Sequence, residues 1–434
     1  MTTGLSEELE PSLFTGQTTV SRDDFQTIMS RLGPWLPDDP AAPPVALAVS
    51  GGGDSIALAW LAAFWRKRLI AFVVDHGLRP EFAQEAASAL KTLAKLGIPA
   101  ELLRVRDLPY GPALAQRARD ARYEVLIEAC RRVGAVDLLV AHQADDQVET
   151  VAMRQRRGSG TGLSGMAWVS ERADIRIIRP LLGYSRETLR NTLRQAGLGW
   201  CDDPSNENER AERVRVRKQL SPTEKQALLR QAEMAANERI RQERAIIHEL
   251  VETQCLMSAG WVALGETLPS VHALAALMRC IGGSDYLPSL EAVEKLREKK
   301  IPGTLGGVRL LRGKTGEDRR EQWLLIREMA AMQSLVPAGK NQCWDRRFVL
   351  RYSGESMPSD LMMGAAGSGL SRKDRAGLPA VLTATLPALW KEGQRLCVPH
   401  MGVGDQKLLA EVSFDFAPQS PVTATFRWMN AYLT

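Results

Sequence analysis

Residues 45–60 read VALAVSGGGDSIALAW, and this stretch decides the fold. An apolar run, Val45–Val49, breaks into a glycine-rich turn, Ser50–Ser55, and a second apolar run follows. A short apolar run bounded by glycines is typical of a buried strand, and the helical pattern that follows covers 55–67. The stretch therefore predicts a buried strand, a tight turn and a helix.

The same alternation continues along the N-terminal half of the chain. Apolar strand-like runs and helical stretches alternate, with the strands at 45–49, 69–74, 100–105 and 137–141 and the helices at 55–67, 81–96, 112–133 and 145–157. This pattern predicts an α/β fold with a doubly wound, mostly parallel sheet that has helices on both faces. Ligands of such sheets bind beyond the carboxyl ends of the strands, where Ser50–Ser55, 75–77 and His142 fall.

Four regions follow from the pattern. Residues 1–24 are polar and predict a flexible N-terminus, and 25–217 hold the strand–helix alternation. The sequence SPTE at 221–224 is a capping box that begins a long helical pattern, so we expect a helical domain over 218–300. Short strand-like pieces predict a small α+β domain over 301–434.

The composition limits the class of protein. The chain has 434 residues, 44% hydrophobic and 25% charged, as is ordinary for a globular protein. No apolar run reaches the roughly 20 residues of a membrane span, and no signal-peptide pattern begins the chain, so we expect a cytoplasmic protein without a membrane partner. The net charge of +5 permits an RNA partner. The cysteines are widely spaced and form no CxxC pair, which indicates free thiols.

The glycine-rich turn has the residues of a phosphate-binding loop, namely Ser50, Gly51, Gly52, Gly53, Asp54 and Ser55. Its glycines let backbone amides converge on an anion, and the N-terminus of the next helix adds partial positive charge. Asp54 would repel a phosphate unless Mg²⁺ bridges the two. No GK[ST] follows, so the loop is not a Walker A motif. The alternative is an ordinary turn in which Asp54 caps the helix.

A second group of polar residues follows the fourth strand. If a helix begins near residue 143, then His142, Asp146 and Glu149 lie on one face of it, at the carboxyl end of the sheet. An imidazole and two carboxylates there suit a cationic substrate, Mg²⁺ or proton transfer. Asp145 has the simpler alternative role of capping the helix.

Several arginines suggest contacts with phosphate or RNA, namely Arg119 and Arg122 beside Tyr123, Arg154 before a glycine-rich loop, and Arg213, Arg215 and Arg217. The last three alternate with valines, so an extended strand would line them up on one face. Such a row beside a nucleotide site favours an RNA partner. The alternatives are solvated basic helix faces and a polar edge strand.

Taken together, these stretches resemble the tRNA(Ile)-lysidine synthetase family. The resemblance covers about residues 45–217 and rests on seven motifs in one order: SGGGDS, VDHGLRPE, ARDARY, HQADDQVET, RRGSGTGLSGM, RPLL and DPSN. The family has a Rossmann-like PP-loop domain that splits ATP between its α and β phosphates. Its members often have a second histidine where Gln143 stands and an asparagine where Val214 stands.

The resemblance implies a reaction and its residues. The enzyme would ligate L-lysine to carbon 2 of the cytidine at the first anticodon position of an isoleucine tRNA with a CAU anticodon, so that AUA is read instead of AUG. Ser50–Ser55 would hold ATP, with Asp54 near Mg²⁺. Asp146, His142 and Glu149 would serve the lysine and the nucleotide. The tRNA would be held by Arg119, Arg122 and some of Arg213, Arg215 and Arg217, and the region after 217 would dock it.

Other enzymes share the ATP loop. A tRNA thiolation enzyme is the main alternative, but those enzymes usually carry paired cysteines, which this chain lacks. A small-molecule amidating synthetase usually has a glutaminase motif, and none is present. A non-catalytic RNA-binding protein with this fold would be expected to lose Asp54 or the acidic face at 142–149.

Overall fold

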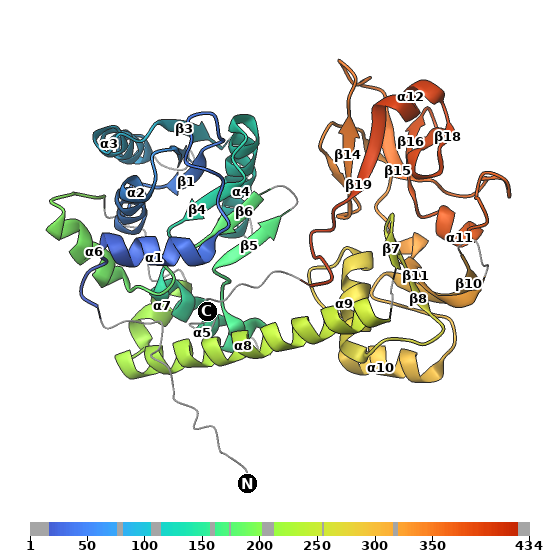
Figure 1. Ribbon diagram of the computed structural model, residues 1–434, viewed down its shortest axis with the longest axis horizontal. Helices are drawn as coiled ribbons and strands as arrows, with labels where there is room; N and C mark the ends of the chain where they lie inside the picture. The colour runs from blue at the N-terminus through green and yellow to red at the C-terminus, as the bar shows by residue number, and fades with distance from the viewer. Residues whose placement is uncertain are drawn as a thin grey trace, which may run out of the picture. The chain divides into compact units, whose positions relative to one another are not determined.

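The computed structural model describes most of the chain (Figure 1). The described residues are 17–75, 81–105, 114–156, 161–172, 175–201, 212–253, 256–315 and 320–423. No helix among them is long and apolar enough to cross a membrane.

The N-terminal half is built on one sheet whose described strands lie in the order β3-β2-β1-β4-β6-β5. Their bounds are β1 Val45–Val49, β2 Leu69–Asp75, β3 Ala100–Arg104, β4 Asp137–Val140, β5 Val169–Arg172 and β6 Ile175–Ile178. All neighbours pair in parallel except β5 with β6, which confirms the predicted mostly parallel sheet. The strand order reverses between β1 and β4, and doubly wound sheets bind ligands at this switch point.

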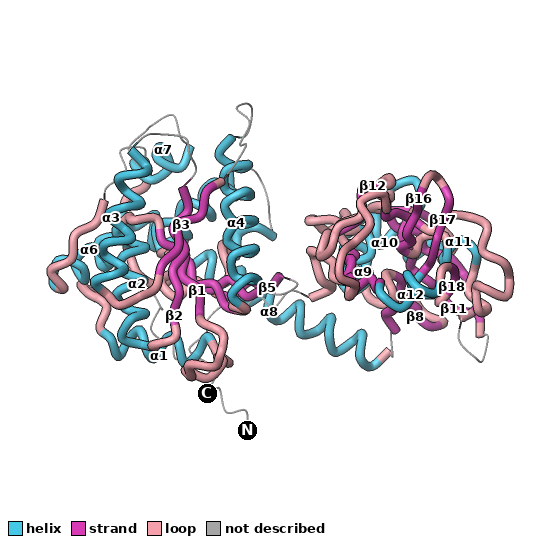
Figure 2. Tube along the Cα trace, turned by 90° about the horizontal axis from the view of Figure 1, so that it is seen from above, coloured by secondary structure: helices cyan, strands magenta, loops and turns pink. Residues whose placement is uncertain are grey.

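Helices cover both faces of this sheet (Figure 2). They are α1 Arg22–Leu32, α2 Gly53–Trp65, α3 Glu81–Lys95, α4 Leu114–Val133, α5 Ala144–Arg156, α6 Arg186–Gln195 and α7 Glu212–Gln219. Successive side chains of β1 enter opposite layers: Val45, Leu47 and Val49 pack in the core with α1, α2 and α6, whereas Ala46 packs with α4. A strand buried on both faces must be apolar throughout, which is why VALAV marks it in the sequence.

The expected flexible N-terminus is ordered over its described residues. Ser21 and Asp24 form a capping box at the start of α1, and the amide of Val20 donates to Thr192 Oγ1 at 2.8 Å. Helix α1 buries Phe25, Met29 and Leu32, which share one helix face. The hydrophobic face of α1 packs in the core of the sheet, so residues 17–24 belong to the folded unit.

The predicted arginine strand is wrong, because residues 212–219 form helix α7. Val214 and Val216 are both buried, as the alternation required, but they are buried by the packing of a helix against α5 and α8. Arg215 is exposed and Arg217 is half-buried, so these two do not share a face. The side chain of Arg213 lies outside the described residues.

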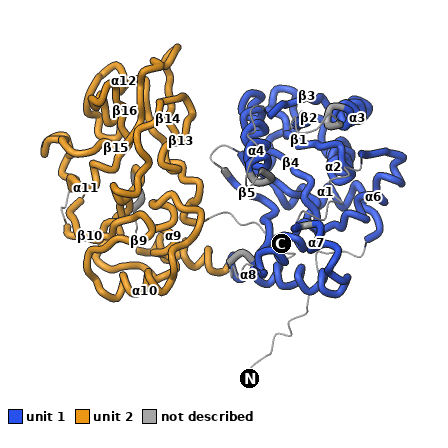
Figure 3. Tube along the Cα trace, turned by 180° about the vertical axis from the view of Figure 1, so that it is seen from behind, with its two compact units in different colours: residues 1–240, 425–434 blue, residues 241–424 orange. Residues whose placement is uncertain are grey.

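The chain divides into two compact units, residues 1–240 with 425–434 and residues 241–424 (Figure 3). The boundary falls within the long helix α8, Pro222–Glu252, which begins at the expected capping box. The expected helical domain over 218–300 is therefore not a separate body. Its strands β7 Leu256–Ser258 and β8 Trp261–Gly265 join a sheet with later strands, and that sheet crosses residue 300.

The described residues of the second unit form three small antiparallel sheets. The first has the order β7-β8-β11-β10-β9 and packs against α9 Val271–Gly282 and α10 Leu290–Lys299; its later strands are β9 Gly303–Leu305, β10 Val308–Lys314 and β11 Glu321–Arg327. The second consists of β12 Val336–Pro337, β15 Met362–Ala365, β16 Pro387–Lys391, β17 Gln394–Val398 and β18 Val403–Gly404, and the third of β13 Cys343–Trp344, β14 Phe348–Tyr352 and β19 Val412–Phe416. Short helices α11 Ala380–Thr383 and α12 Gln406–Glu411 connect strands.

Candidate active site

The glycine-rich loop joins β1 to α2 and is held by its two serines. Ser55 Oγ donates to the Gly52 carbonyl at 2.9 Å and accepts from the Ser50 amide at 3.2 Å. Gly51 has φ +89°, and a Cβ there would lie 3.3 Å from the Glu85 carbonyl oxygen of α3. A left-handed residue pressed against another helix has to be glycine. These contacts fix the shape of the loop, and they place the N-terminus of α2 at the carboxyl ends of the strands.

Asp54 does not cap helix α2. The N-cap residue is Gly52, which makes no side-chain cap, and Asp54 lies in the first turn. The alternative interpretation of the loop, with Asp54 as a cap, is thereby wrong. The Asp54 carboxylate instead faces Arg186 at the start of α6, with Oδ2 3.5 Å from Nε.

Asp146 faces the same guanidinium from the other side of the switch point. Its Oδ1 lies 3.6 Å from Nη2 of Arg186, and its Oδ2 accepts from the Gln143 amide at 3.2 Å. Asp54 follows β1 and Asp146 follows β4, so neighbouring strands deliver the two carboxylates to one cation. The cap of α5 is Gln143, whose Oε1 accepts from the Asp145 amide at 2.6 Å, so the alternative role of Asp145 as the cap is wrong.

Asp145 points in a different direction. Its Oδ2 accepts from the Arg186 amide at 3.0 Å, and its Oδ1 lies 3.6 Å from Nζ of Lys225 on α8. The contact of the Asp145 carboxylate with the first amide of α6 is favourable, because the N-terminus of a helix carries partial positive charge. Asp145 thus holds α5, α6 and α8 together, and Asp146 is the acid that faces Asp54.

Burial and charge set the protonation of this cluster. Burial raises the pKa of Asp54 from 3.8 to about 6, an effect that Arg186 opposes and Asp146 increases. Burial acts to lower the pKa of Arg186, but the surrounding carboxylates outweigh it and raise that pKa, Asp54 most strongly. Arg186 is therefore a permanent cation between two acids.

Glu149 and Arg217 form a buried ion pair next to this cluster. Glu149 Oε1 lies 2.7 Å from Nε of Arg217, and the Glu149 side chain is 3% exposed. Burial raises the pKa of Glu149 while the hydrogen bond from Arg217 lowers it. His142 lies between β4 and α5 and is half-buried. One arginine of the expected tRNA row thus contacts a candidate catalytic acid.

Arg119 and Arg122 lie on α4 and are half-buried. Each guanidinium carbon is 5.4 Å from the centre of the Tyr123 ring, which is within the range of a cation–π contact. The Tyr123 side chain is only 5% exposed, so its ring is held in place and can fix the positions of the two guanidiniums. Three quoted motifs lie wholly or partly outside the described residues, at 76–80, 157–160 and 202–211.

Arg186 is the site residue that the sequence analysis missed. It is 132 positions from Asp54, so its place in the site depends on the tertiary fold. A local signal was present, because Ser185 caps α6 and accepts from the Thr188 amide at 3.1 Å. That cap predicts a helix N-terminus with Arg186 as its first residue, but not which strands it meets.

Gln147 holds Met166, the last residue of the glycine-rich motif after α5. Its Nε2 donates to the Met166 carbonyl at 2.8 Å and its Oε1 accepts from the Met166 amide at 2.6 Å. Arg154, a candidate phosphate ligand, donates to the Gly165 carbonyl at 2.9 Å. In this contact Arg154 binds the protein backbone and not a phosphate.

Replacing Gly165 by alanine is expected to lower the free energy of unfolding by about 3 kcal/mol. Gly165 has φ +66°, and a Cβ there would lie 2.6 Å from Gln147 Oε1. The matched control is Gly197→Ala, because Gly197 has φ +65° with nothing within 4 Å of the added Cβ. Urea unfolding of both variants separates the conformational cost from the steric one. Equal losses would mean that the contact with Gln147 is easily relieved.

Several known proteins are similar to this chain. A family model described as a PP-loop domain matches residues 25–224. The tRNA(Ile)-lysidine synthase of Ruegeria pomeroyi is 35% identical over 389 residues, which are 84% of this chain and 91% of that protein. The tRNA(Ile)-lysidine synthase of Hyphomonas neptunium is 38% identical and covers 64% of this chain and 82% of that protein. A solved U34-tRNA thiolase from Methanococcus maripaludis is similar over 49% of this chain and 78% of its own, with 18% identity and a TM-score of 0.40. With this identity over most of its length, the chain belongs to the tRNA(Ile)-lysidine synthase family.

Proposed function

We propose that this chain ligates L-lysine to carbon 2 of the cytidine at the first anticodon position of an isoleucine tRNA with a CAU anticodon. The reaction consumes ATP and releases AMP and pyrophosphate. The main support is the convergence of Asp54 and Asp146 on Arg186, at the switch point of the sheet and beside the phosphate loop. ATP and tRNA are both cytoplasmic, which supports a cytoplasmic location.

In the first step the cytosine carbonyl oxygen attacks the α phosphate of ATP. A bond forms between that oxygen and phosphorus, and the bond to the leaving pyrophosphate breaks. The amides at the N-terminus of α2 hold the phosphates, since no acidic cap competes for them. The Ser50 amide is different, because it already donates to Ser55 Oγ. Arg186 adds a fixed cation at the same edge, and cations that meet developing phosphate charge stabilise such transition states.

Asp54 and Asp146 fit a magnesium site. Both supply carboxylate oxygens, the ligand that Mg²⁺ prefers, and both already face one cation in this structure. The described ranges hold no group of three or more acidic, histidine or cysteine side chains placed for a metal, so phosphate and water would complete the coordination. Mg²⁺ bound there would neutralise phosphate charge during the attack.

In the second step the lysine amine attacks carbon 2, the bond between carbon 2 and the adenylated oxygen breaks, and AMP leaves with that oxygen. The attacking amine must lose a proton, and the product base carries the new carbon–nitrogen bond. We assign the binding and deprotonation of this amine to Glu149, His142 and Asp146. Glu149 suits the role because burial raises its pKa and makes it a better proton acceptor.

The arginines supply the RNA side of the site. We assign Arg119 and Arg122 on α4, with Arg213 and Arg215 of α7, to the cytidine and its phosphates. Arg215 is exposed and suits a phosphate contact. Arg217 is different, because its guanidinium already pairs with Glu149. We therefore propose that Arg217 positions Glu149 and leaves the phosphates to its neighbours.

Labelled lysine should enter isoleucine tRNA with a CAU anticodon when the protein, ATP and Mg²⁺ are all present. The control is the same tRNA with UAU in the anticodon, which lacks the target cytosine and should take up no label. AMP should form in equal amount to incorporated lysine, because each ligation releases one AMP. Folded protein that binds tRNA but incorporates no lysine would rule out the proposed reaction.

A further inference from the structure

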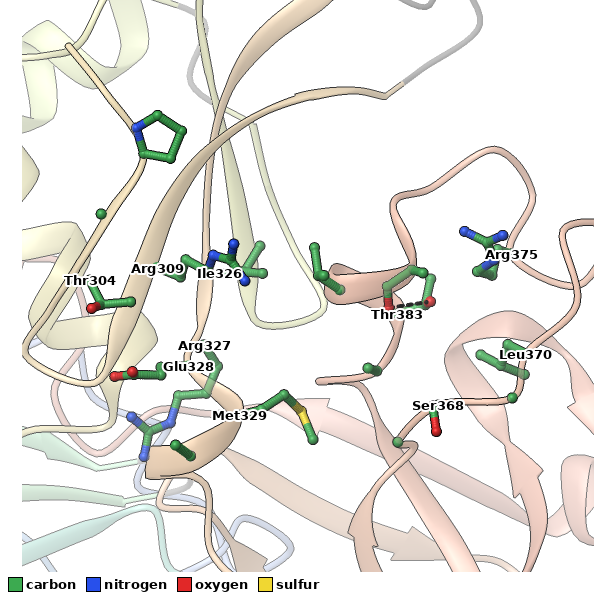
Figure 4. A pocket seen from close by; sticks show the side chains of 18 residues that line it. Thr304, Arg309, Ile326, Arg327, Glu328, Met329, Ser368, Leu370, Arg375 and Thr383 are labelled. Atoms are coloured by element: carbon green, nitrogen blue, oxygen red, sulfur yellow. Dashed lines mark hydrogen bonds between the residues drawn. The ribbon is translucent and has the colours of Figure 1, made fainter.

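The second unit contains a cavity of about 600 Å³ that has no assigned ligand (Figure 4). One wall carries Thr304, Arg309, Ile326 and Glu328, and the other carries Leu370 and Arg375. The volume lies within the range of small-ligand and nucleotide pockets. We propose that this cavity binds one unpaired nucleotide of the tRNA; the inference rests on the proposed function and gives the second unit a defined contact.

The strand register explains the first wall. Arg309 on β10 pairs with Thr304 on β9 and with Ile326 on β11, so the three side chains form one row across the sheet. Glu328 follows Ile326 by two positions, which keeps it on the same face. A hydroxyl, a guanidinium and a carboxylate are thereby presented side by side, and the buried side chain of Ile326 lies beneath them.

Three charged side chains that line the cavity are not used by the fold. Within the part of the chain that the structure describes, the side chains of Arg309, Glu328 and Arg375 form no hydrogen bond or ion pair, and the Nε atom of Arg375 is buried. Arg327, which also lines the cavity, and the nearby Arg395 behave differently. Arg327 pairs with Asp345, and Arg395 donates to two backbone carbonyls near residue 367. Arg309 and Arg375 therefore remain available for an anion.

The chemistry of the lining selects a nucleotide. Two guanidiniums suit a phosphodiester, and a carboxylate can accept from the exocyclic amine of a base. Apolar side chains at Leu370 and at the exposed Met329 (45%) and Val381 (42%) can cover the face of a base. An unpaired base exposes both its face and its amine, whereas a paired base exposes neither fully. A free amino acid offers no ring for the apolar side chains to cover.

Measuring the binding of the full chain to isoleucine tRNA tests whether the two cavity arginines contact the RNA. Arg309→Gln and Arg375→Gln should each raise the Kd for tRNA about tenfold, because each removes one phosphate contact. Arg312→Gln is the matched control. It changes the same residue type on the same strand, but its guanidinium lies 4.6 Å from the Trp323 ring and does not line the cavity. Kd values for Arg309→Gln and Arg375→Gln equal to that of the control would overturn the inference.

Crosslinking tests the occupant. Transcripts of the tRNA with 4-thiouridine placed at random should crosslink, under ultraviolet light, to peptides within 303–330 or 367–384, and from unpaired positions of the RNA. Crosslinks from paired positions only, or protection of the cavity by free lysine but not by tRNA, would contradict an unpaired nucleotide. Tight binding and crosslinking without lysine incorporation would leave this inference standing while removing the proposed reaction.

Discussion

The Asp54→Asn variant is expected to lose AMP release by about a thousandfold while it binds tRNA as the wild type does. Asn keeps the shape of the side chain but removes the charge that Arg186 and Mg²⁺ would contact. The tRNA contacts proposed above lie on other elements, so the Kd for tRNA should not change. Single-turnover AMP release and tRNA binding measure the two effects separately. A parallel loss of both would mean that Asp54 acts through the fold.

The same variant is expected to be more stable than the wild type. Burial raises the pKa of Asp54 from 3.8 to about 6, so the fold disfavours the ionised carboxylate. The full shift corresponds to about 3 kcal/mol, but the side chain keeps 25% of its surface exposed and solvent reduces this to about 1–2 kcal/mol. A folded-state pKa above the unfolded one stabilises the fold at low pH, and this contribution is lost as the pH rises through about 6.

The variant and the wild type should therefore have similar free energies of unfolding near pH 4 and differ by the full amount above about pH 6. In the wild type, stability should rise as the pH falls, whereas activity should decrease. Because Asp54 must be ionised to contact a cation, kcat/KM for Mg·ATP should fall as the pH drops below about 6. Urea unfolding at several pH values, compared with the kcat/KM profile, tests both statements.

The parallel sheet could be predicted from the sequence, because a strand that is buried on both faces has a recognisable local sequence. Strands such as Val45–Val49 must be apolar at every position, and the glycine turn after them must fit against α3. The helix face with Asp146 and Glu149 was also predictable, since helical spacing fixes which side chains share a face. The strand and helix bounds accordingly fall within a few residues of those expected.

Other features depended on contacts between distant segments. The five residues at 213–217 alternate as a strand does, but both valines are buried by α7 packing, and five residues are too few to separate the two periods. The partner of Glu149 lies 68 positions away, and Arg186 lies 132 positions from Asp54. The short strands of the second unit carry weak patterns, so a sheet that crosses residue 300 was expected as two domains.

Replacing Arg186 by methionine should lower kcat by about a hundredfold and, at the same time, strengthen the binding of Mg²⁺ in the absence of ATP. In the wild type a guanidinium already lies 3.5 Å from Asp54 and 3.6 Å from Asp146, so Mg²⁺ must compete with it for the two carboxylates. Methionine fills similar space without charge and leaves both acids facing each other. The shift of the melting temperature with added Mg²⁺ should therefore be larger in the variant than in the wild type.

Arg194→Met is the matched control, because Arg194 lies on the same helix but is exposed and pairs with Glu187. It should change neither kcat nor the response to Mg²⁺. Opposite changes in kcat and Mg²⁺ response for Arg186→Met are informative, because a general loss of structure would weaken both. If the kcat and the Mg²⁺ response of Arg186→Met both matched those of the control, Arg186 would have no part in the reaction.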